Sequence, residues 1–331
     1  MSGAALDRLL AILIAAQVVT GLLSLRAGIP ATAPLFWLHG LVGGALLIAA
    51  TEKLRRSLGP ALRRRRWGRL ALGALLTLLV AAALAGGFTW VAGGRILSIG
   101  PWTILTLHVW AGLAVIPIVV IHLVPRRWRL LRSRVATGPR MSRRTALAMG
   151  GVAVLGASAW GAANLLDRVL GGVRRFTGSR WLPHGGVPPP TTFYGEPTPP
   201  VDPDAWRLRI GGRVGAPITL DLVELGALGE VEREAVLDCT SGWVMRTTWR
   251  GTPLQAVLEA AGADPSSPRV SVRSVTGWMV RLAPQELDDA LLATHVAGRP
   301  LPAGNGSPVR LVAPQRRGLD WIKWVDRIEV G

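Results

Sequence analysis

The sequence of 331 residues has a single cysteine, Cys239, and a single tyrosine. With one cysteine, an intramolecular disulfide is excluded, and cysteine usage gives no indication of the redox compartment. Lysine is scarce as well, because only Lys53 and Lys323 stand among the 38 basic residues. Since nearly every other basic position is arginine, a lysine at position 323 suggests a site that requires a compact ammonium group.

Acidic residues are also few: 20 of them stand against 38 basic residues, which leaves a net charge of +18. Nucleic-acid binding is one source of such a charge. Here, however, the basic residues are concentrated in two short runs between long apolar segments, and 50% of the chain is hydrophobic. This combination is typical of a membrane protein with basic loops, and no nucleic acid is expected as a partner.

Long apolar segments are abundant in the first half of the chain. Five of them fit the roughly 17–25 apolar residues that cross a bilayer. Any one alone could be a buried core helix, but five in succession, separated by short basic or Gly/Pro-rich loops, favour transmembrane helices. We expect these helices at residues 9–25, 35–51, 70–92, 103–124 and 145–166.

The basic runs predict how the helices are oriented. Segments 52–69 and 125–144 carry eight basic residues each, whereas the loops at the opposite ends of the helices carry one each. Because loops rich in Arg and Lys stay in the cytoplasm, the N-terminus is predicted to be cytoplasmic and the region after the fifth helix extracytoplasmic. The predicted location is the cytoplasmic membrane, with several passes through the lipid bilayer.

The entry to the fifth helix reads Ser-Arg-Arg-Thr-Ala-Leu at 142–147. This resembles a twin-arginine export motif; the alternative is an ordinary basic stretch before a helix. An Ala-x-Ala sequence follows at 157–159 and could be cleaved. We expect an uncleaved anchor, because cleavage would separate the first four helices from the rest of the chain.

Three histidines, His39, His108 and His122, lie in predicted transmembrane helices, where ionisable residues are costly. His39 and His108 each lie near the start of a helix that enters from the outer face, so they are predicted to lie at similar depth. Two such imidazoles can be the axial ligands of a haem b. His122 follows His108 by four turns, about 21 Å along the helix, and is an alternative partner. The other possibility is that these histidines form interhelical hydrogen bonds or face water.

Residues 171–205 are rich in Gly and Pro and predict a linker and extended arm without regular elements. From residue 206 the pattern changes to a compact mixed α+β domain. We expect strands at 206–210, 231–237, 270–273, 278–282, 309–313 and 321–330, and helices at 220–228, 254–261 and 284–292.

Cys239 follows the predicted strand and precedes Thr240, Ser241 and Gly242, and a turn is expected further on, at 251–253, before the helix at 254–261. A cysteine at the end of a strand, before a flexible loop, is well placed to reach out of a fold. The alternative is a small buried hydrophobic side chain, as free cysteine often is.

The segment from Cys239 to Leu254 reads C-x3-W-x5-W-x-G-x-P-L, and a second segment, N-G-x-P-x-R, begins at Asn305. Together they resemble the sulfite oxidase / methionine sulfoxide reductase superfamily of molybdopterin enzymes, over residues 193–330. The resemblance implies that Cys239 is the catalytic thiolate that binds molybdenum, since a soft thiolate suits such a metal and the metal deprotonates it.

The resemblance also implies a set of residues that contact Mo-molybdopterin. Two of them depart from the methionine sulfoxide reductase branch, which often has Asn at position 191 and Glu at position 195. Substrate-pocket candidates, by position only, are Trp243, Arg246 and Arg316. The implied cofactor-binding residues are Thr191, Tyr194, Gly195, Ser274, Asn305, Arg310, Trp321, Ile322 and Lys323.

The sequence therefore predicts a membrane-anchored molybdopterin-dependent oxidoreductase that acts on a small-molecule substrate by oxygen-atom or sulfoxide-type chemistry. Electrons would pass through one haem b to quinone or another membrane carrier. The alternatives are a haem-only electron-transfer protein with a degenerate molybdopterin-fold domain, and a transporter-like protein with an exported sensor domain. The predicted domains are a cytochrome b-like four-helix domain (1–131), a basic loop and fifth helix (132–170), a linker and arm (171–205) and the molybdopterin domain (206–331).

Overall fold

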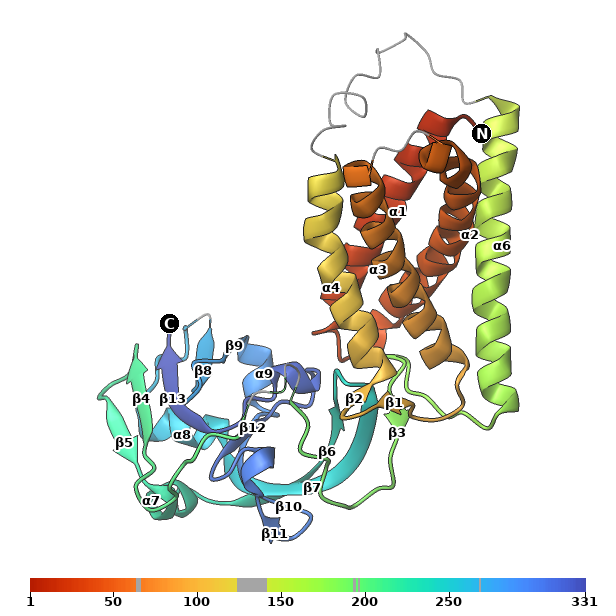
Figure 1. The fold of residues 1–331 in the computed structure, drawn as a ribbon. Coiled ribbons are helices and arrows are strands. Elements are labelled where there is room, and N and C mark those ends of the chain that lie inside the picture. Colours follow the sequence, from red (N-terminus) through yellow and green to blue (C-terminus); the bar gives the residue numbers. More distant parts are fainter. Residues whose placement is uncertain (64–66, 124–141, 193–194, 196, 268) are drawn as a thin grey trace. The chain divides into compact units, whose positions relative to one another are not determined.

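The computed structural model describes residues 1–331 except 64–66, 124–141, 193–194, 196 and 268. Most of the basic loop 125–144, the predicted boundary after residue 131 and the predicted cofactor residue Tyr194 lie outside the described residues. The chain divides into two compact units (Figure 1). Unit 1 comprises Met1–Ser24 and Ala31–Gly178, and unit 2 comprises Leu25–Pro30 and Ser179–Gly331.

Unit 1 consists mainly of long helices. Among the described residues, five helices are long and apolar enough to cross a membrane, and each overlaps one of the five predicted stretches. They are α1 (Gly3–Ser24), α2 (Ala33–Arg63), α3 (Trp67–Ala92), α4 (Ile104–Leu123) and α6 (Arg143–Val169). A turn, η1 (Pro30–Thr32), precedes α2, and two short strands, β1 (Ser98–Ile99) and β2 (Trp102–Thr103), precede α4.

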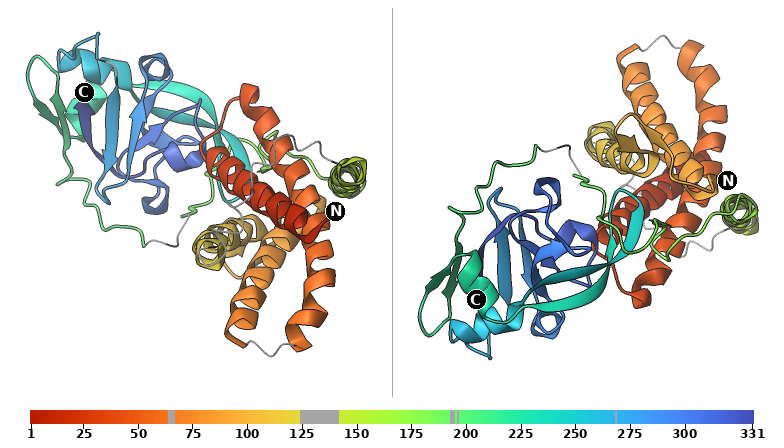
Figure 2. Two further views of the ribbon diagram at one scale, coloured as in Figure 1. Left: turned by 90° about the horizontal axis from the view of Figure 1, so that it is seen from above. Right: turned by 90° about the horizontal axis from the view of Figure 1, so that it is seen from below.

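Large apolar side chains on these helices point outward. Leu78 on α3 is 67% exposed, and Leu147 on α6 is 77% exposed. Exposing apolar area to water costs roughly 25 cal/mol per Å², so a surface built of such residues suits lipid rather than water. Figure 2 shows α6 (light green) nearly end-on at the edge of this unit.

Glycines allow α2 and α6 to pack closely. A Cβ on Gly44 would collide with the Gly156 carbonyl, and a Cβ on Gly40 would collide with the indole of Trp160. Small residues at such contacts let the backbones of membrane helices approach. Because Gly40 and Gly44 are four residues apart, they share the face of α2 that contacts α6.

Unit 2 is a mixed α+β domain, and its described residues form two sheets. In the larger sheet, the long strand β7 pairs antiparallel with β6 and β10 and parallel with β3, while β10 also pairs with β11 and β12. These strands are β3 (Arg180–Trp181), β6 (Val231–Asp238), β7 (Trp243–Pro253), β10 (Leu291–Val296), β11 (Arg299–Pro300) and β12 (Arg310–Val312).

The smaller sheet has the order β5-β4-β13-β8-β9, in which β13 is parallel to β4 and antiparallel to β8. Its strands alternate between buried and exposed positions, as on β4, where Leu208 and Ile210 are buried and Arg209 is exposed. The strands are β4 (Leu208–Gly212), β5 (Ile218–Leu220), β8 (Val270–Ser274), β9 (Met279–Leu282) and β13 (Val325–Val330). The helical elements are α7 (Leu222–Ala227), α8 (Leu254–Ala260), α9 (Pro284–Leu287), η3 (Ala303–Asn305) and η4 (Gly318–Asp320).

Two predictions around the larger sheet are wrong. The helix expected at 284–292 ends at Leu287, and residues 291–296 form β10. The first residues of β10 are fully buried between β7 and β12, and a continuous apolar run of this kind does not distinguish a central strand from a buried helix. The turn expected at 251–253 is instead the end of β7, where the absence of a side chain on Gly251 lets Leu292 approach.

Two further boundaries differ from the sequence analysis. The predicted linker 171–205 contains β3, because the backbone N–H groups of Arg180 and Leu182 donate to Gly242 and Val244 of the adjacent turn and strand. The last strand begins at Val325 rather than at residue 321, since Trp324 has a left-handed backbone (φ 53°) that interrupts extended structure. The arm therefore follows β7 instead of running as an independent linker.

Candidate metal and cofactor sites

Cys239 lies in the turn that joins β6 to β7. Its N–H donates to the Trp243 carbonyl (2.9 Å), and its carbonyl accepts from the Gly242 N–H (2.9 Å). Gly242 has φ 99°, a conformation that favours glycine. The half-buried Sγ accepts a hydrogen bond from the Ser241 N–H (3.4 Å). Burial raises the pKa of the thiol, while Ser241 and Arg317 partly offset this effect.

A buried polar network supports the turn that contains Cys239. Arg317 donates from one nitrogen, Nη2, to the Asp238 carboxylate (3.1 Å), the Ser179 hydroxyl (3.1 Å) and the Cys239 carbonyl (3.2 Å). The Ser179 hydroxyl also donates to the Asp238 carboxylate (2.6 Å). All three side chains are buried. This network was not predicted from the sequence, although Asp238 directly precedes the cysteine.

Arg310 is the second cation near the cysteine. Its buried guanidinium lies 5.4 Å from the ring centre of Trp249 and 5.9 Å from that of Trp321. Nη1 donates to the Asn305 carbonyl (3.0 Å), but the buried Nε has no hydrogen-bond partner among the described residues. Burial lowers the pKa of Arg310 to about 10, and the charge of Cys239 opposes that shift. A buried cation with an unused donor fits an anionic cofactor group.

The extended arm before residue 192 is held by three of the predicted residues. Lys323 Nζ donates to the carbonyls of Thr191 (2.9 Å) and Gly304 (2.6 Å). Asn305 Nδ2 donates to the Pro188 carbonyl (2.9 Å). The Trp243 indole donates to the Thr191 hydroxyl (3.0 Å). The structure thus brings these side chains together around the arm, and it gives Lys323 the role of clamping backbone carbonyls.

The other predicted cofactor residues lie at the edges of this region. Ser274 ends β8, and its hydroxyl accepts from the N–H (3.2 Å) and hydroxyl (3.0 Å) of Thr276, which closes the β8–β9 turn. Trp321 is buried against Trp249, with ring centres 5.5 Å apart. Ile322 is buried too, and Gly195 has φ 75° in the arm.

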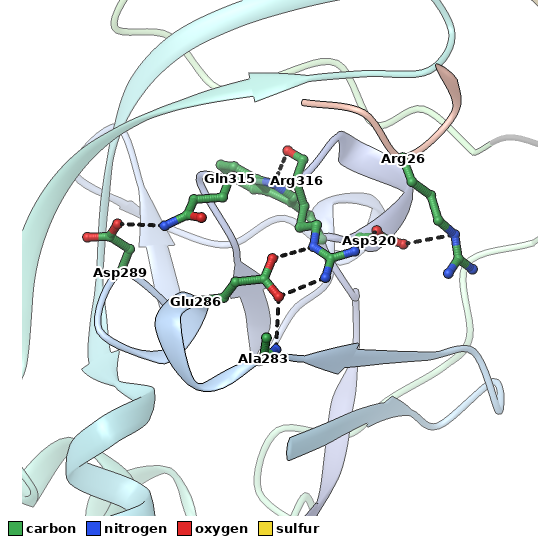
Figure 3. Close-up of polar contacts among 8 residues, drawn as sticks. Arg26, Ala283, Glu286, Asp289, Gln315, Arg316 and Asp320 are labelled. Atoms are coloured by element: carbon green, nitrogen blue, oxygen red, sulfur yellow. Dashed lines mark hydrogen bonds and ion pairs between the residues drawn. The ribbon is translucent and has the colours of Figure 1, made fainter. Parts of the chain in front are cut away.

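The substrate candidates Arg316 and Arg246 are already engaged in ion pairs. Arg316 forms a two-pronged ion pair with Glu286 (2.5 and 2.7 Å) and a longer contact with Asp320 (3.4 Å), as Figure 3 shows. Arg246 is half exposed and pairs with Glu234 (3.5 Å). Either guanidinium would therefore have to break its ion pair with a carboxylate before it could bind a substrate.

In unit 1, His39 on α2 and His108 on α4 face each other. Their ring centres are 6.0 Å apart, and the ring planes are nearly perpendicular (86°). His39 Nδ1 hydrogen-bonds the Thr20 hydroxyl (2.8 Å), and His108 Nδ1 hydrogen-bonds the Ala83 carbonyl (2.7 Å). Metal–imidazole bonds of about 2 Å place the centres of two opposed rings roughly 6 Å apart, so the spacing of the two ring centres matches that of two imidazoles on one metal.

His122 lies near the end of α4, fourteen residues beyond His108, and thus about 21 Å further along the helix than the facing pair. Among the described residues, no cluster of three or more His, Cys, Asp or Glu side chains is placed to hold a metal ion. A haem between two histidines, or a single thiolate beside a pterin, does not require one.

Comparison with known proteins defines the class of unit 2. Residues 195–331 match the family described as an oxidoreductase molybdopterin binding domain. This confirms the predicted domain type: the chain carries an oxidoreductase molybdopterin binding domain at these residues.

Curated relatives are methionine sulfoxide reductase subunits. The chain is 36% identical over 143 residues to the "Protein-methionine-sulfoxide reductase catalytic subunit MsrP" of Xanthomonas axonopodis pv. citri (strain 306), covering 37% of this chain and 44% of the relative. It is 32% identical over 148 residues to the MsrP of Gluconobacter oxydans (strain 621H), covering 39% and 47%. The chain thus spans less than half the length of these relatives. The crystal structure of the sulfane dehydrogenase SoxCD from Paracoccus pantotrophus matches with 23% identity and a TM-score of 0.39, over 40% of each chain.

Proposed function

We propose that this protein is a membrane-anchored oxidoreductase whose molybdopterin domain works on the outer face of the cytoplasmic membrane. Five apolar helices and the concentration of basic residues in alternate loops support the anchor and its orientation. The observation that carries the enzymatic part is the Cys239 turn, which presents a sulfur beside the buried Arg310 within the matched domain.

The residues of unit 2 have distinct roles in this proposal. Cys239 would hold the molybdenum as a thiolate, because a coordinating thiol is deprotonated even where burial favours its protonated form. Arg310 offers its unused Nε–H to an anionic part of the pterin cofactor, while Lys323 and Asn305 hold the arm at Thr191 and Pro188. When bound, the cofactor supplies two-electron oxygen-atom chemistry, for which the name of the curated relatives suggests a sulfoxide substrate.

The helices of unit 1 supply the electron path in this proposal. His39 and His108 would hold one haem b, and His122 takes no part. Reduction of a sulfoxide to a sulfide and water consumes two electrons and two protons. A quinol could supply both, and a haem held by these histidines would supply one-electron transfer.

Metal analysis and optical spectroscopy of the full chain, purified in detergent, test both halves. We expect molybdenum and haem in the wild type, loss of molybdenum alone in Cys239→Ser, and loss of haem alone in His39→Ala. Haem without molybdenum in the wild type would favour an electron-transfer protein with a degenerate molybdopterin fold. Molybdenum without haem in the wild type would contradict the proposed electron path, but it would still agree with a molybdenum enzyme.

A further inference from the structure

The hydrogen bonds of the facing histidines fix where their ring protons lie. The partner of His108 Nδ1 is the Ala83 carbonyl, which can only accept, so this nitrogen carries the proton. The partner of His39 Nδ1 is the Thr20 hydroxyl, whose own proton is directed to the Ala16 carbonyl (2.6 Å). The Thr20 oxygen therefore accepts from His39, and both rings keep a lone pair on Nε2.

Glycines and a buried threonine hold the two rings in this orientation. A Cβ on Gly21 would lie 3.3 Å from His39 Cε1, and a Cβ on Gly87 would lie 3.1 Å from His108 Cε1. Thr20 is 5% exposed, and Gln17 on the same helix donates to the His39 carbonyl (2.6 Å). His39 thus packs against the face of α1 that carries Gln17, Thr20 and Gly21.

The two rings differ in the kind of acceptor at Nδ1. For His108 it is a main-chain carbonyl, which no substitution at position 83 removes. For His39 it is a side-chain hydroxyl, which a single substitution deletes. An acceptor at the distal ring nitrogen orients a ligating histidine and raises its basicity. A more basic axial ligand favours ferric over ferrous iron and so lowers the reduction potential, since hydrogen bonding beyond the ligands is one of the factors that set it.

We propose that Thr20 is a positioning residue for the haem: its hydroxyl holds His39 in the Nδ1–H tautomer and sets the reduction potential of the iron that His39 binds. This inference rests on the haem of the proposed function. It adds α1, which carries no histidine, to the helices that determine the properties of the haem.

Redox titration of the haem absorbance in the full chain, purified in detergent, tests the proposal. Thr20→Val keeps the shape of the side chain and removes the acceptor, so the midpoint potential should rise while the haem stays bound. Thr20→Ser restores a hydroxyl and should return the wild-type value. Thr77→Val is the matched control, because the Thr77 hydroxyl also bonds a main-chain carbonyl within its helix (Gly73, 2.8 Å) but is exposed; it should leave the potential unchanged.

Five outcomes decide the question. A bound haem with an unshifted potential in Thr20→Val overturns the role of Thr20, as does an equal shift in Thr77→Val. Loss of haem from Thr20→Val with retention in Thr20→Ser supports the positioning role, because Thr20→Ser keeps the hydroxyl that Thr20→Val lacks. A wild type without haem, or a haem that persists in both His39→Ala and His108→Ala, defeats the proposed haem site itself.

Discussion

The ligand side chains of the two candidate sites are held by different kinds of groups. Around Cys239 in unit 2 the support is ionic: Asp238 and Arg317 are both buried and lie 3.1 Å apart. Around His39 and His108 in unit 1 the support is neutral, consisting of a hydroxyl and a carbonyl. A charge is costly within a bilayer, whereas a folded domain can bury one if it is paired and hydrogen-bonded. The two sites thus differ in whether a charged or a neutral group supports the candidate ligand.

The ionic support has a consequence for stability. Removing one member of a buried pair leaves an uncompensated charge, whereas removing a neutral hydrogen bond costs far less. The difference predicts large effects of substitutions around Cys239 and smaller ones around the histidines. The predictions below test that order.

Arg317→Met should have the largest effect. It leaves the Asp238 carboxylate buried without its cation and should destabilise unit 2 by about 3–5 kcal/mol. Urea unfolding of the full chain in detergent, with molybdenum content measured in parallel, checks this. Arg246→Met is the matched control: its pair with Glu234 is exposed and is worth less than about 1 kcal/mol. Equal losses in the two variants would refute the ionic support.

Lys323→Met should have the next largest effect. The ammonium loses its bonds to the carbonyls of Thr191 and Gly304, and charge-assisted bonds contribute about 1.5–3 kcal/mol. We expect the arm to become sensitive to proteolysis and the molybdenum content to fall. Lys323→Arg should not rescue fully, because a planar guanidinium does not reproduce the contacts of a compact ammonium with two carbonyls. Arg281→Met, on the exposed side of β9, is the control, and arm cleavage at an unchanged rate in Lys323→Met would contradict the clamp.

Gly87→Ala tests the neutral site. The added Cβ would lie 3.1 Å from His108 Cε1, and overpacking of this kind costs about 1–3 kcal/mol. Haem affinity should fall by roughly tenfold, since 1.4 kcal/mol corresponds to that factor. Gly73→Ala on the same helix is the control, because nothing lies within 4 Å of its Cβ position. Full haem content in both variants would show that His108 is not tightly seated.

How much of this was predictable depends on how local each feature is. Cys239 and the segment at Asn305 form linear motifs, so the family and the domain type could be inferred directly. The Asp238–Arg317 contact joins residues 79 positions apart, and Ser179 lies 59 positions from Asp238. No spacing rule connects such residues, because the arm, β6 and the loop before η4 meet only after the sheet has formed.

The facing histidines could be anticipated from their similar depth in two helices, since helical rise converts sequence position into depth. Their partners Thr20 and Ala83 could not, because the rotation of α1 and α3 about their axes is fixed only by packing. β10 was missed for a related reason. Its apolar run fits a buried helix as well as a central strand, and only its pairing with β7 and β12 decides between them.

The smallest predicted effect is a pH dependence at the Glu286–Arg316 pair. Burial alone would raise the pKa of Glu286, but hydrogen bonds from Arg316 and the Ala283 N–H lower it overall from its usual 4.5. The stability that this pair contributes is therefore fully present above about pH 4.5 and is lost as the pH falls through the lower folded-state pKa. Glu286→Gln should flatten the decline of the unfolding free energy in that acidic range.

Urea unfolding between about pH 5 and pH 3 measures that slope. Glu234→Gln is the control, because its pair with Arg246 is exposed and should leave the wild-type slope intact. Since the side chains of Glu286 and Arg316 are both partly exposed, screening by water and salt keeps the effect small, and it should shrink further at high ionic strength. An equally steep decline in Glu286→Gln would show that the partly exposed ion pair at Glu286 contributes nothing to stability. The buried pair of Asp238 and Arg317 would then be the feature that distinguishes the ionic site of unit 2 from the neutral site of unit 1.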